Sequence, residues 1–244
     1  MPVSCFAERL SGFIALTPGE RAALDRLEER ERVLRRGATL VREKDHGSEM
    51  FVLRRGTMMS SVLLDDGSRQ ILRFMFPGEL LAGSTLVYRE ATETLTALTD
   101  CTVSPFERTL LAKVIEEHPR LAAVIMVYSQ IERAALTDRL AALGRTSAKA
   151  RVAAILIDMR NRQRMSNPGL GSSFVLGLTQ EEIGDATGLT AVHVNRMLRQ
   201  LEEEDLIARE AGRMIFKDER ALSRAANYIN RYAGLDLGWL PPAR

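Results

Sequence analysis

Residues 178–203 read LTQEEIGDATGLTAVHVNRMLRQLEE, and the fold of the carboxyl half can be predicted from these residues. Thr179 and Glu182 have the spacing of a capping box, which predicts a short helix that begins after Thr179. Residues 188–190 (Gly-Leu-Thr) predict a turn, and Thr190 is a typical N-cap for a second helix. Because two helices joined by so short a turn must cross steeply, the stretch predicts a helix-turn-helix.

The second predicted helix has one apolar and one outward face. Helical spacing places four apolar side chains inward: Val194, Met197, Leu198 and Leu201. The outward face near the amino end presents Ala191, Val192, Asn195, Arg196 and Arg199. Such a helix fits the major groove of DNA, where Asn pairs with adenine and Arg with guanine, and its amino terminus favours a phosphate. The alternative is a helical hairpin that only packs, because similar patterns recur in proteins that do not bind DNA.

The sequence on both sides of this motif favours DNA binding over a hairpin that only packs. Residues 206–209 and 214–216 flank a turn and predict a hairpin wing, from which Arg209 and Arg213 would touch the DNA backbone. Upstream, a basic segment with one acidic residue, Asp158, is suited to neutralising phosphates. Its six basic residues are Arg145, Lys149, Arg151, Arg160, Arg162 and Arg164. The alternative for this segment is a solvated helix face.

Composition and charge narrow the class of protein. The chain has 244 residues, of which 45% are hydrophobic and 27% charged, so it is expected to fold into one large or two modest domains. Residues 1–144 carry 19 basic and 20 acidic residues, whereas residues 145–244 carry 15 and 12. The carboxyl half is therefore the basic half, although an excess of three positive charges is unremarkable for a domain.

Several kinds of protein are excluded by what the sequence lacks. There is no long apolar run and no leader-like amino terminus, so we expect a cytoplasmic protein without a membrane segment. Two cysteines, Cys5 and Cys101, are too few for a disulfide framework or an all-cysteine metal site, so neither a metal nor a cofactor is expected. The common hydrolase, metalloprotease, P-loop and dinucleotide motifs are absent, which argues against an enzyme.

The amino half predicts an all-β module after one short helix. Residues 17–20 (Thr-Pro-Gly-Glu) form a capping box for a helix that runs to about Glu29. From residue 31 to 106, short β-rich runs alternate with turns at the spacing of an antiparallel barrel or roll. The strongest hairpin signal in this region is Asp66-Gly67.

A long helix is predicted over residues 121–143, after a break at His118-Pro119 and with Gly144 as its end. One stripe on this helix has coiled-coil spacing: Leu121, Val124, Tyr128, Ile131 and Ala135. A second apolar face holds Ile125, Leu136, Leu140 and Leu143. We expect the coiled-coil stripe to pair with a second chain; packing within its own chain is the alternative. A following helix would be capped by Thr146 or Ser147.

The helix-turn-helix stretch resembles that of the CRP/FNR transcription regulators. The resemblance lies in residues 184–190, 195–202 and 206–207, and it extends over nearly the whole chain. In the predicted roll, four places match features of the family's roll: residues 54–56 (Arg-Arg-Gly), 66–67, 77–78 (Pro-Gly) and Cys101. It implies an α+β fold with an antiparallel β-roll sensor domain over residues 1–120, a dimerisation helix over 121–144 and a winged helix-turn-helix over 145–244. It also implies a homodimer on two half-sites about 34 Å apart.

The resemblance also indicates which ligand-binding residues of the family are missing from this chain. Members that bind cyclic AMP have Gly-Glu and then Arg-Ser, where Glu holds the ribose and Arg the cyclic phosphate. The matching places here read Gly83-Ser84 and Ala91-Thr92, so we do not expect cyclic-nucleotide binding in the usual manner. The cysteine cluster of oxygen-sensing members is absent as well. A haem on His46 or His118 is the weaker alternative to a surface histidine.

The expected function is therefore a DNA-binding transcription regulator that acts as a homodimer on a palindromic operator, with RNA polymerase as a further partner and an unidentified small-molecule effector. Arg196 matches the base-reading Arg of the family, Val192 suits a thymine methyl group, and His193 suits a phosphate or base. The DNA-contacting residues expected are Thr190, Ala191, Val192, His193, Asn195, Arg196, Arg199 and Arg213. The alternative is a small-molecule sensor that acts through a protein partner. The tail, residues 235–244, is expected to dock on the winged domain.

Overall fold

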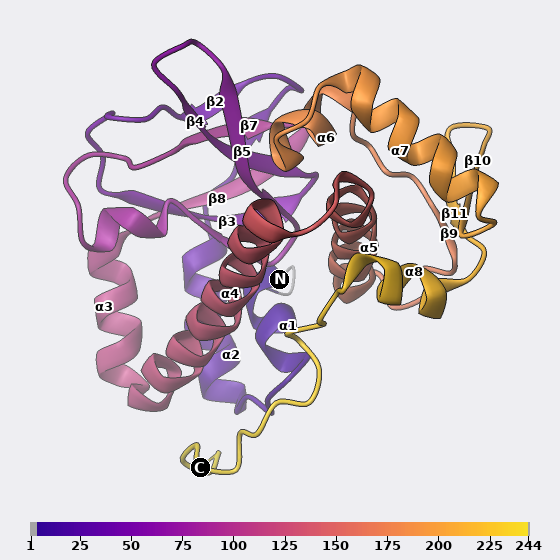
Figure 1. Cartoon of the computed structure of the whole chain (residues 1–244). Helices are drawn as coiled ribbons and strands as arrows, with labels where there is room; N and C mark the ends of the chain where they lie inside the picture. Colours follow the sequence, from indigo (N-terminus) through magenta and orange to yellow (C-terminus); the bar gives the residue numbers. More distant parts are fainter. Residues whose placement is uncertain (1–3, 244) are drawn as a thin grey trace. The chain divides into compact units, whose positions relative to one another are not determined.

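Two four-stranded antiparallel sheets form the β-rich part of the chain in the computed structural model, which describes residues 4–243 (Figure 1). Residues 1–3 and 244, at the ends of the predicted domains, lie outside it. The first sheet has the order β1 (Arg32–Leu34), β8 (Cys101–Glu107), β3 (Glu49–Arg55), β6 (Leu80–Leu81). The second has the order β2 (Thr39–Val41), β7 (Thr94–Ala97), β4 (Met58–Leu63), β5 (Arg69–Met75). The predicted β-roll is confirmed.

The described residues form two units, and neither is a single stretch of sequence. Residues 4–62, 73–133 and 232–243 form one, which we call the roll unit. Residues 63–72 and 134–231 form the other, which we call the helix-turn-helix unit. The predicted α+β class is confirmed, with a roll, a long helix after it and a carboxyl-terminal helix-turn-helix.

The roll unit has two apolar clusters: one lies between its first sheet and its helices, and the other is formed by residues of both sheets. Strands β3 and β8 pair along most of their length, with Val52 opposite Ser104, and both residues are fully buried. Helix α2 (Pro18–Asp25) begins at the predicted capping box and continues into a short 3-10 turn, η1 (Arg26–Glu28). Helix α1 (Cys5–Ser11) was missed by the sequence patterns, although Ser4 caps it.

A buried polar cluster in the roll unit joins residues from distant parts of the sequence. Arg9 Nη2 lies 2.9 Å from Glu79 Oε1, and their side chains are only 2% and 0% exposed. Arg73 Nη1 lies 3.1 Å from Glu132 Oε2. Burial, together with the nearby Glu79 and Glu132 carboxylates, raises the pKa of the Tyr128 phenol, so the phenol stays neutral. Each charge in the cluster therefore needs its partner, because a lone buried charge is unfavourable.

The carboxyl-terminal tail belongs to the roll unit, so its predicted docking on the winged domain is wrong. The Tyr232 hydroxyl donates to Glu132, and the Arg9 guanidinium lies 5.5 Å from the centre of the Tyr232 ring. Arg120 Nε donates to the Pro241 carbonyl at 2.7 Å, while the same guanidinium also binds Glu20. Polar anchors, rather than apolar contact alone, thus decide where the tail lies.

The long helix α4 (Pro119–Arg145) follows α3 (Arg108–Glu117) after the predicted break at His118. It extends two residues beyond the predicted range, 121–143, at each end, and Gly144 lies within the helix and does not end it as predicted. Four members of the predicted coiled-coil stripe are buried, and three of them belong to the core of the roll unit; the four are Leu121, Val124, Tyr128 and Ile131. The assignment of this stripe to a second chain is therefore wrong, because the roll unit already covers it. A different face is exposed, and it holds Met126, Leu136 and Leu140.

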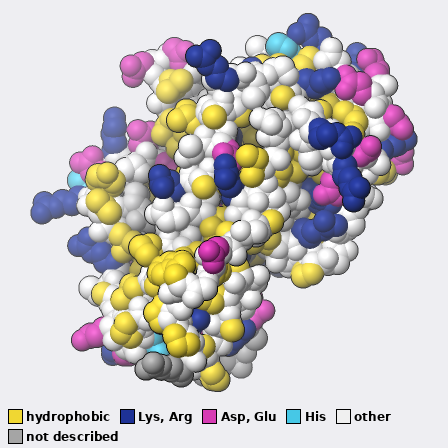
Figure 2. Space-filling view, turned by 60° about the horizontal axis from the view of Figure 1, so that its bottom comes forward, with side chains coloured by type: hydrophobic (Ala, Val, Ile, Leu, Met, Phe, Trp, Pro, Cys, Tyr) yellow, Lys and Arg dark blue, Asp and Glu magenta, His cyan; other side chains and the backbone are white. Residues whose placement is uncertain are grey.

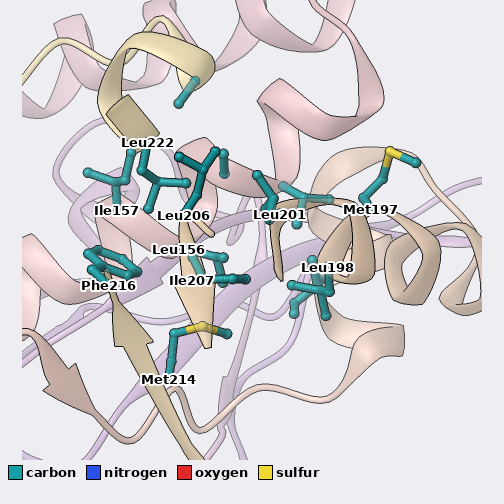
Figure 3. Close-up of a cluster of buried hydrophobic side chains, with 14 of the residues drawn as sticks. Leu156, Ile157, Met197, Leu198, Leu201, Leu206, Ile207, Met214, Phe216 and Leu222 are labelled. Carbon is teal, nitrogen blue, oxygen red and sulfur yellow. The ribbon is translucent and has the colours of Figure 1, made fainter. Parts of the chain in front are cut away.

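Among the described residues, most of the helix-turn-helix unit consists of five helices and three short strands. The second part of α4 is one of the five helices. After α4 come α5 (Ala148–Ser166), β9 (Ser173–Phe174), α6 (Gln180–Thr187), α7 (Ala191–Glu203), β10 (Ile207–Glu210), β11 (Arg213–Phe216) and α8 (Glu219–Ala226). Ser147 caps α5, as one of the two predicted candidates. Figure 3 shows the apolar core in which α7, β10, β11 and α8 pack against α5. Sequence patterns do not predict α8.

Replacing Glu79 with Gln should strongly destabilise the roll unit, because the buried Arg9 guanidinium would lose its charged partner. We expect the free energy of unfolding to fall by about 3 kcal/mol, measured by urea denaturation. Glu8→Gln is the matched control, because the Glu8–Arg21 pair is exposed, and its change should stay below about 1 kcal/mol. Equal effects of the two substitutions would contradict the prediction.

Candidate nucleic-acid interface

The turn between α6 and α7 is set by a close backbone approach at Gly184. A Cβ atom at this position would lie 2.4 Å from the Leu189 carbonyl oxygen, so only glycine fits without a backbone shift. The Leu189 amide donates to the Gly184 carbonyl at 3.1 Å. Gly188 ends α6 with φ +67°, in the left-handed region that favours glycine. The predicted turn at residues 188–190 is therefore present.

Helix α7 presents the two faces that its sequence predicts. Thr190 Oγ1 accepts from the His193 amide at 3.3 Å and so caps the helix. The inward face is buried and consists of Val194, Met197, Leu198 and Leu201; Figure 3 labels the last three. On the other face Val192 is 83% exposed, Arg196 and Arg199 are exposed, and Asn195 is half-buried. An exposed Val next to exposed arginines has no packing role in the described chain.

Seven of the eight predicted contact residues lie together on α7 and its N-cap, and Arg213 lies apart on β11. Arg196 Nη2 is 2.8 Å from His193 Nε2, so the two side chains form one polar surface on the first turns of the helix. Arg199 lies one turn further along, and its side chain is exposed. The arrangement offers hydrogen-bond donors, an imidazole and an apolar Val side chain on one face.

The wing is a tight hairpin whose two arginines are held by their own unit. Ala211 and Gly212, with φ 47° and 75°, form the turn between β10 and β11. Arg209 forms a two-bond ion pair with Glu202, at 2.8 and 2.6 Å. Arg213 donates to the hydroxyl and carbonyl oxygens of Ser173, at 2.7 and 2.8 Å. Sequence patterns miss Ser173, because its strand β9 is only two residues long.

Only part of the basic segment upstream is exposed. The prediction that its basic residues can neutralise phosphates is therefore wrong for two of them. Arg160 is fully buried, where it pairs with Glu219 and lies 5.2 Å from the centre of the Phe216 ring. Arg162 is 4% exposed and lies near Asp158. Neither can neutralise a phosphate, because both balance charge or pack within the unit.

Charges of both signs are also mixed on the visible surface. On the right-hand part of the view in Figure 2, dark blue Lys and Arg side chains lie among magenta Asp and Glu side chains. Within the helix-turn-helix unit, the ion pairs Lys149–Glu204, at 2.5 Å, and Lys217–Asp205, at 3.2 Å, also bring charges of both signs together. The charge distribution of this unit therefore suits recognition of DNA by particular side chains better than general attraction of DNA by a uniformly basic surface.

The positions that match the cyclic-nucleotide contacts carry no charge. Gly83 and Ser84 begin a short 3-10 turn, η2 (Gly83–Leu86), which follows Ala82 in the left-handed region. Ala91 is buried, and its amide donates to the Asp45 carbonyl at 2.9 Å. Among the described residues, 4–243, no group of three His, Cys, Asp or Glu side chains could hold a metal ion.

Comparison with known proteins agrees with this architecture. Residues 31–118 match the model of the cyclic nucleotide-binding domain, and residues 150–225 match that of the Crp-like helix-turn-helix domain. The nitrogen fixation regulation protein FixK of Bradyrhizobium diazoefficiens is 33% identical over 174 residues, which cover 70% of this chain and 71% of that protein. The chain belongs to the CRP/FNR family of transcription regulators.

Other relatives extend the similarity. The transcriptional activator protein Anr of Pseudomonas aeruginosa is 28% identical over 81% of this chain and 80% of its own. The solved structure of FixK2 from Bradyrhizobium japonicum has a TM-score of 0.72 at 25% identity, covering 80% of this chain and 96% of that chain. This CRP/FNR protein is thus a DNA-binding transcription regulator rather than an enzyme. No helix among its described residues is long and apolar enough to cross a membrane.

Gly184→Ala should disrupt the turn, because the new Cβ would meet the Leu189 carbonyl. We expect the helix-turn-helix unit to lose about 1 to 3 kcal/mol of stability, measured by thermal unfolding of the full chain. Gly144→Ala is the matched control: Gly144 is helical, and a Cβ there would meet nothing within 4 Å. That control should be neutral or stabilising by up to about 1 kcal/mol. A stable Gly184→Ala variant would show that the turn adapts.

Proposed function

We propose that this CRP/FNR regulator binds a palindromic operator as a homodimer, with α7 of each protomer in the major groove. The observation that carries the proposal is the exposed amino-terminal face of α7, where Arg196, Arg199 and Val192 project without packing against the chain. The buried opposite face fixes the helix to its unit. A rigid helix with exposed donors is what base reading in the major groove requires.

Each outward residue of α7 is given a role by its chemistry. Arg196 suits a guanine, which accepts two hydrogen bonds from a guanidinium, and Asn195 suits an adenine. Val192 offers a methyl contact to thymine. Thr190, Ala191 and the amino end of the helix suit a phosphate, as do His193 and Arg199. Arg213 would reach the DNA backbone only by sharing or leaving its bonds to Ser173.

The exposed face of α4 is the proposed dimer interface. Met126 and Leu140 lie two heptads apart in the sequence, and Leu136 lies one helical turn before Leu140. These side chains are 51%, 72% and 40% exposed, respectively. Large apolar side chains at heptad-related positions on a long helix favour pairing with an equivalent helix. A two-fold axis there would give operator half-sites about 34 Å apart.

The roll unit is proposed to act as a sensor domain without the usual cyclic-AMP contacts. Ser84 and Ala91 replace the carboxylate and guanidinium that would hold the ribose and the phosphate, and an uncompensated phosphate binds poorly. We propose a sensor domain over residues 1–120, a dimerisation helix over 121–144 and a winged helix-turn-helix domain over 145–244, except that the hairpin tip (residues 63–72) belongs with the helix-turn-helix unit and the tail (residues 232–243) with the roll unit. RNA polymerase is proposed as a further partner, because Anr, a relative, is named a transcriptional activator.

Selection of DNA from a random pool by the purified protein should enrich a palindromic site, and Arg196→Ala should lose that enrichment. We expect its affinity for the selected site to fall by about 1 to 3 kcal/mol, with relaxed specificity at one position of each half-site. Arg89→Ala removes an exposed charge from the roll unit and is the control. Binding that is equally sequence-blind and equally salt-dependent in all three proteins would contradict base reading by α7 and would favour a protein partner.

Leu140→Glu should convert the dimer to a monomer, because it places a charge on the proposed apolar interface. Sedimentation equilibrium should give about half the mass of the unsubstituted protein at the same concentration. Val87→Glu is the control, since Val87 is 76% exposed in the roll unit. A dimer that persists in Leu140→Glu would place the interface elsewhere.

A further inference from the structure

The tip of the β4–β5 hairpin belongs to the helix-turn-helix unit, although its strands begin and end in the roll. Residues 63–72 form this tip, with Gly67 at φ +82° in the turn. Arg69 Nε and Nη2 lie 2.8 and 2.7 Å from Asp185 Oδ2, near the end of α6. Gln70 Nε2 donates to the Asp185 carbonyl at 2.7 Å. An element from the roll half of the sequence therefore binds the first helix of the DNA-binding motif.

Arg139 makes a second connection between the same segments. Its Nη2 donates at 2.9 Å to the Ile71 carbonyl in the hairpin and at 2.9 Å to the Ala186 carbonyl in α6. Burial lowers the pKa of this guanidinium to about 10, so it is still charged at neutral pH. One side chain of α4 thus joins the hairpin and α6 through two carbonyl oxygens.

Gln70 and Arg139 bind backbone carbonyls that α6 cannot satisfy by itself, whereas Arg69 binds the Asp185 carboxylate. The last four carbonyls of a helix have no intrahelical partner, and those of Asp185 and Ala186 are among them. The Gly184 carbonyl is taken by the Leu189 amide of the turn. A helix carboxyl end also attracts cations, so Arg69 and Arg139 stand where the helix dipole favours them. The hairpin thus completes the end of α6, next to the turn that sets the direction of α7.

We propose that the hairpin tip, residues 63–72, caps α6 and that Arg69 and Gln70 are positioning residues for DNA binding. They act by fixing the angle at which α7 leaves the turn. The inference rests on the proposed operator binding. Because β4 and β5 continue into the roll, where Met58 and Met75 are core residues, a shift of these strands would be transmitted to α6.

Arg69→Ala, compared with unsubstituted protein and Arg89→Ala, tests this in two measurements. Hydrogen exchange of the DNA-free protein should show faster exchange over residues 180–189 in Arg69→Ala only. Fluorescence anisotropy with the selected operator should show about five- to twentyfold weaker binding, the range typical of coupling between sites. Arg69→Lys keeps the charge and should recover most of that loss. Arg89→Ala removes the same charge from a side chain outside the hairpin, so it controls for electrostatic attraction.

The dependence of affinity on salt separates positioning from direct DNA contact. A positioning residue leaves the slope of log affinity against log salt unchanged, whereas loss of a phosphate contact reduces it by about 1. Unchanged exchange over residues 180–189, affinity equal to that of Arg89→Ala, or a reduced slope would each overturn the inference. If the unsubstituted protein selects no operator, the proposed function fails, and the exchange measurement alone decides whether the hairpin caps α6.

Discussion

The Leu189 carbonyl oxygen occupies the space where a side chain at position 184 would begin, and the exposed face of α7 proposed to bind DNA depends on this contact. The approach closes the turn, the turn sets the angle between α6 and α7, and that angle decides which side of α7 is exposed. Gly188, in the left-handed region, and Thr190, as N-cap, allow the chain to reverse within so few residues. The exposure of Arg196 and Arg199 on α7 therefore depends on this backbone contact.

The arginines of this protein fall into two groups, buried ones that bind groups within their own unit and exposed ones at the surface. Arg160, Arg139 and Arg9 lie inside their units, where they bind carboxylates, carbonyl oxygens or aromatic faces. A planar guanidinium is suited to such sites because it spreads its charge over several donors. Arg196 and Arg199 keep their charge at the surface. Net charge therefore exaggerates the basic surface of the carboxyl half, since part of that charge is balanced internally.

Local patterns predict much of this fold, and long-range contacts account for what they miss. Residue spacing suffices to predict features that depend on neighbours in the sequence. These are the capping boxes at Thr17 and Thr179, the turn at residues 188–190 and the inward face of α7. The stripe on α4 has the same spacing whether it faces a roll or a second chain, so periodicity cannot assign its partner. Burial of Arg160, and the bonds of Arg213 to Ser173, depend on residues 59 and 40 positions away. No local signal carries that information.

The tail has a consequence for how this protein can be divided. Tyr232 and Pro241 are bound by Glu132 and Arg120, so the last segment of the sequence completes the unit built from the first. A chimera that joins this roll to a relative's DNA-binding region must carry residues 232–243 with the roll, or leave Glu132 without its phenol partner. A fragment cut at the end of α4 lacks that segment too, and its stability would underestimate that of the intact unit. In this chain the order of the sequence is a poor guide to where one module can be exchanged for another.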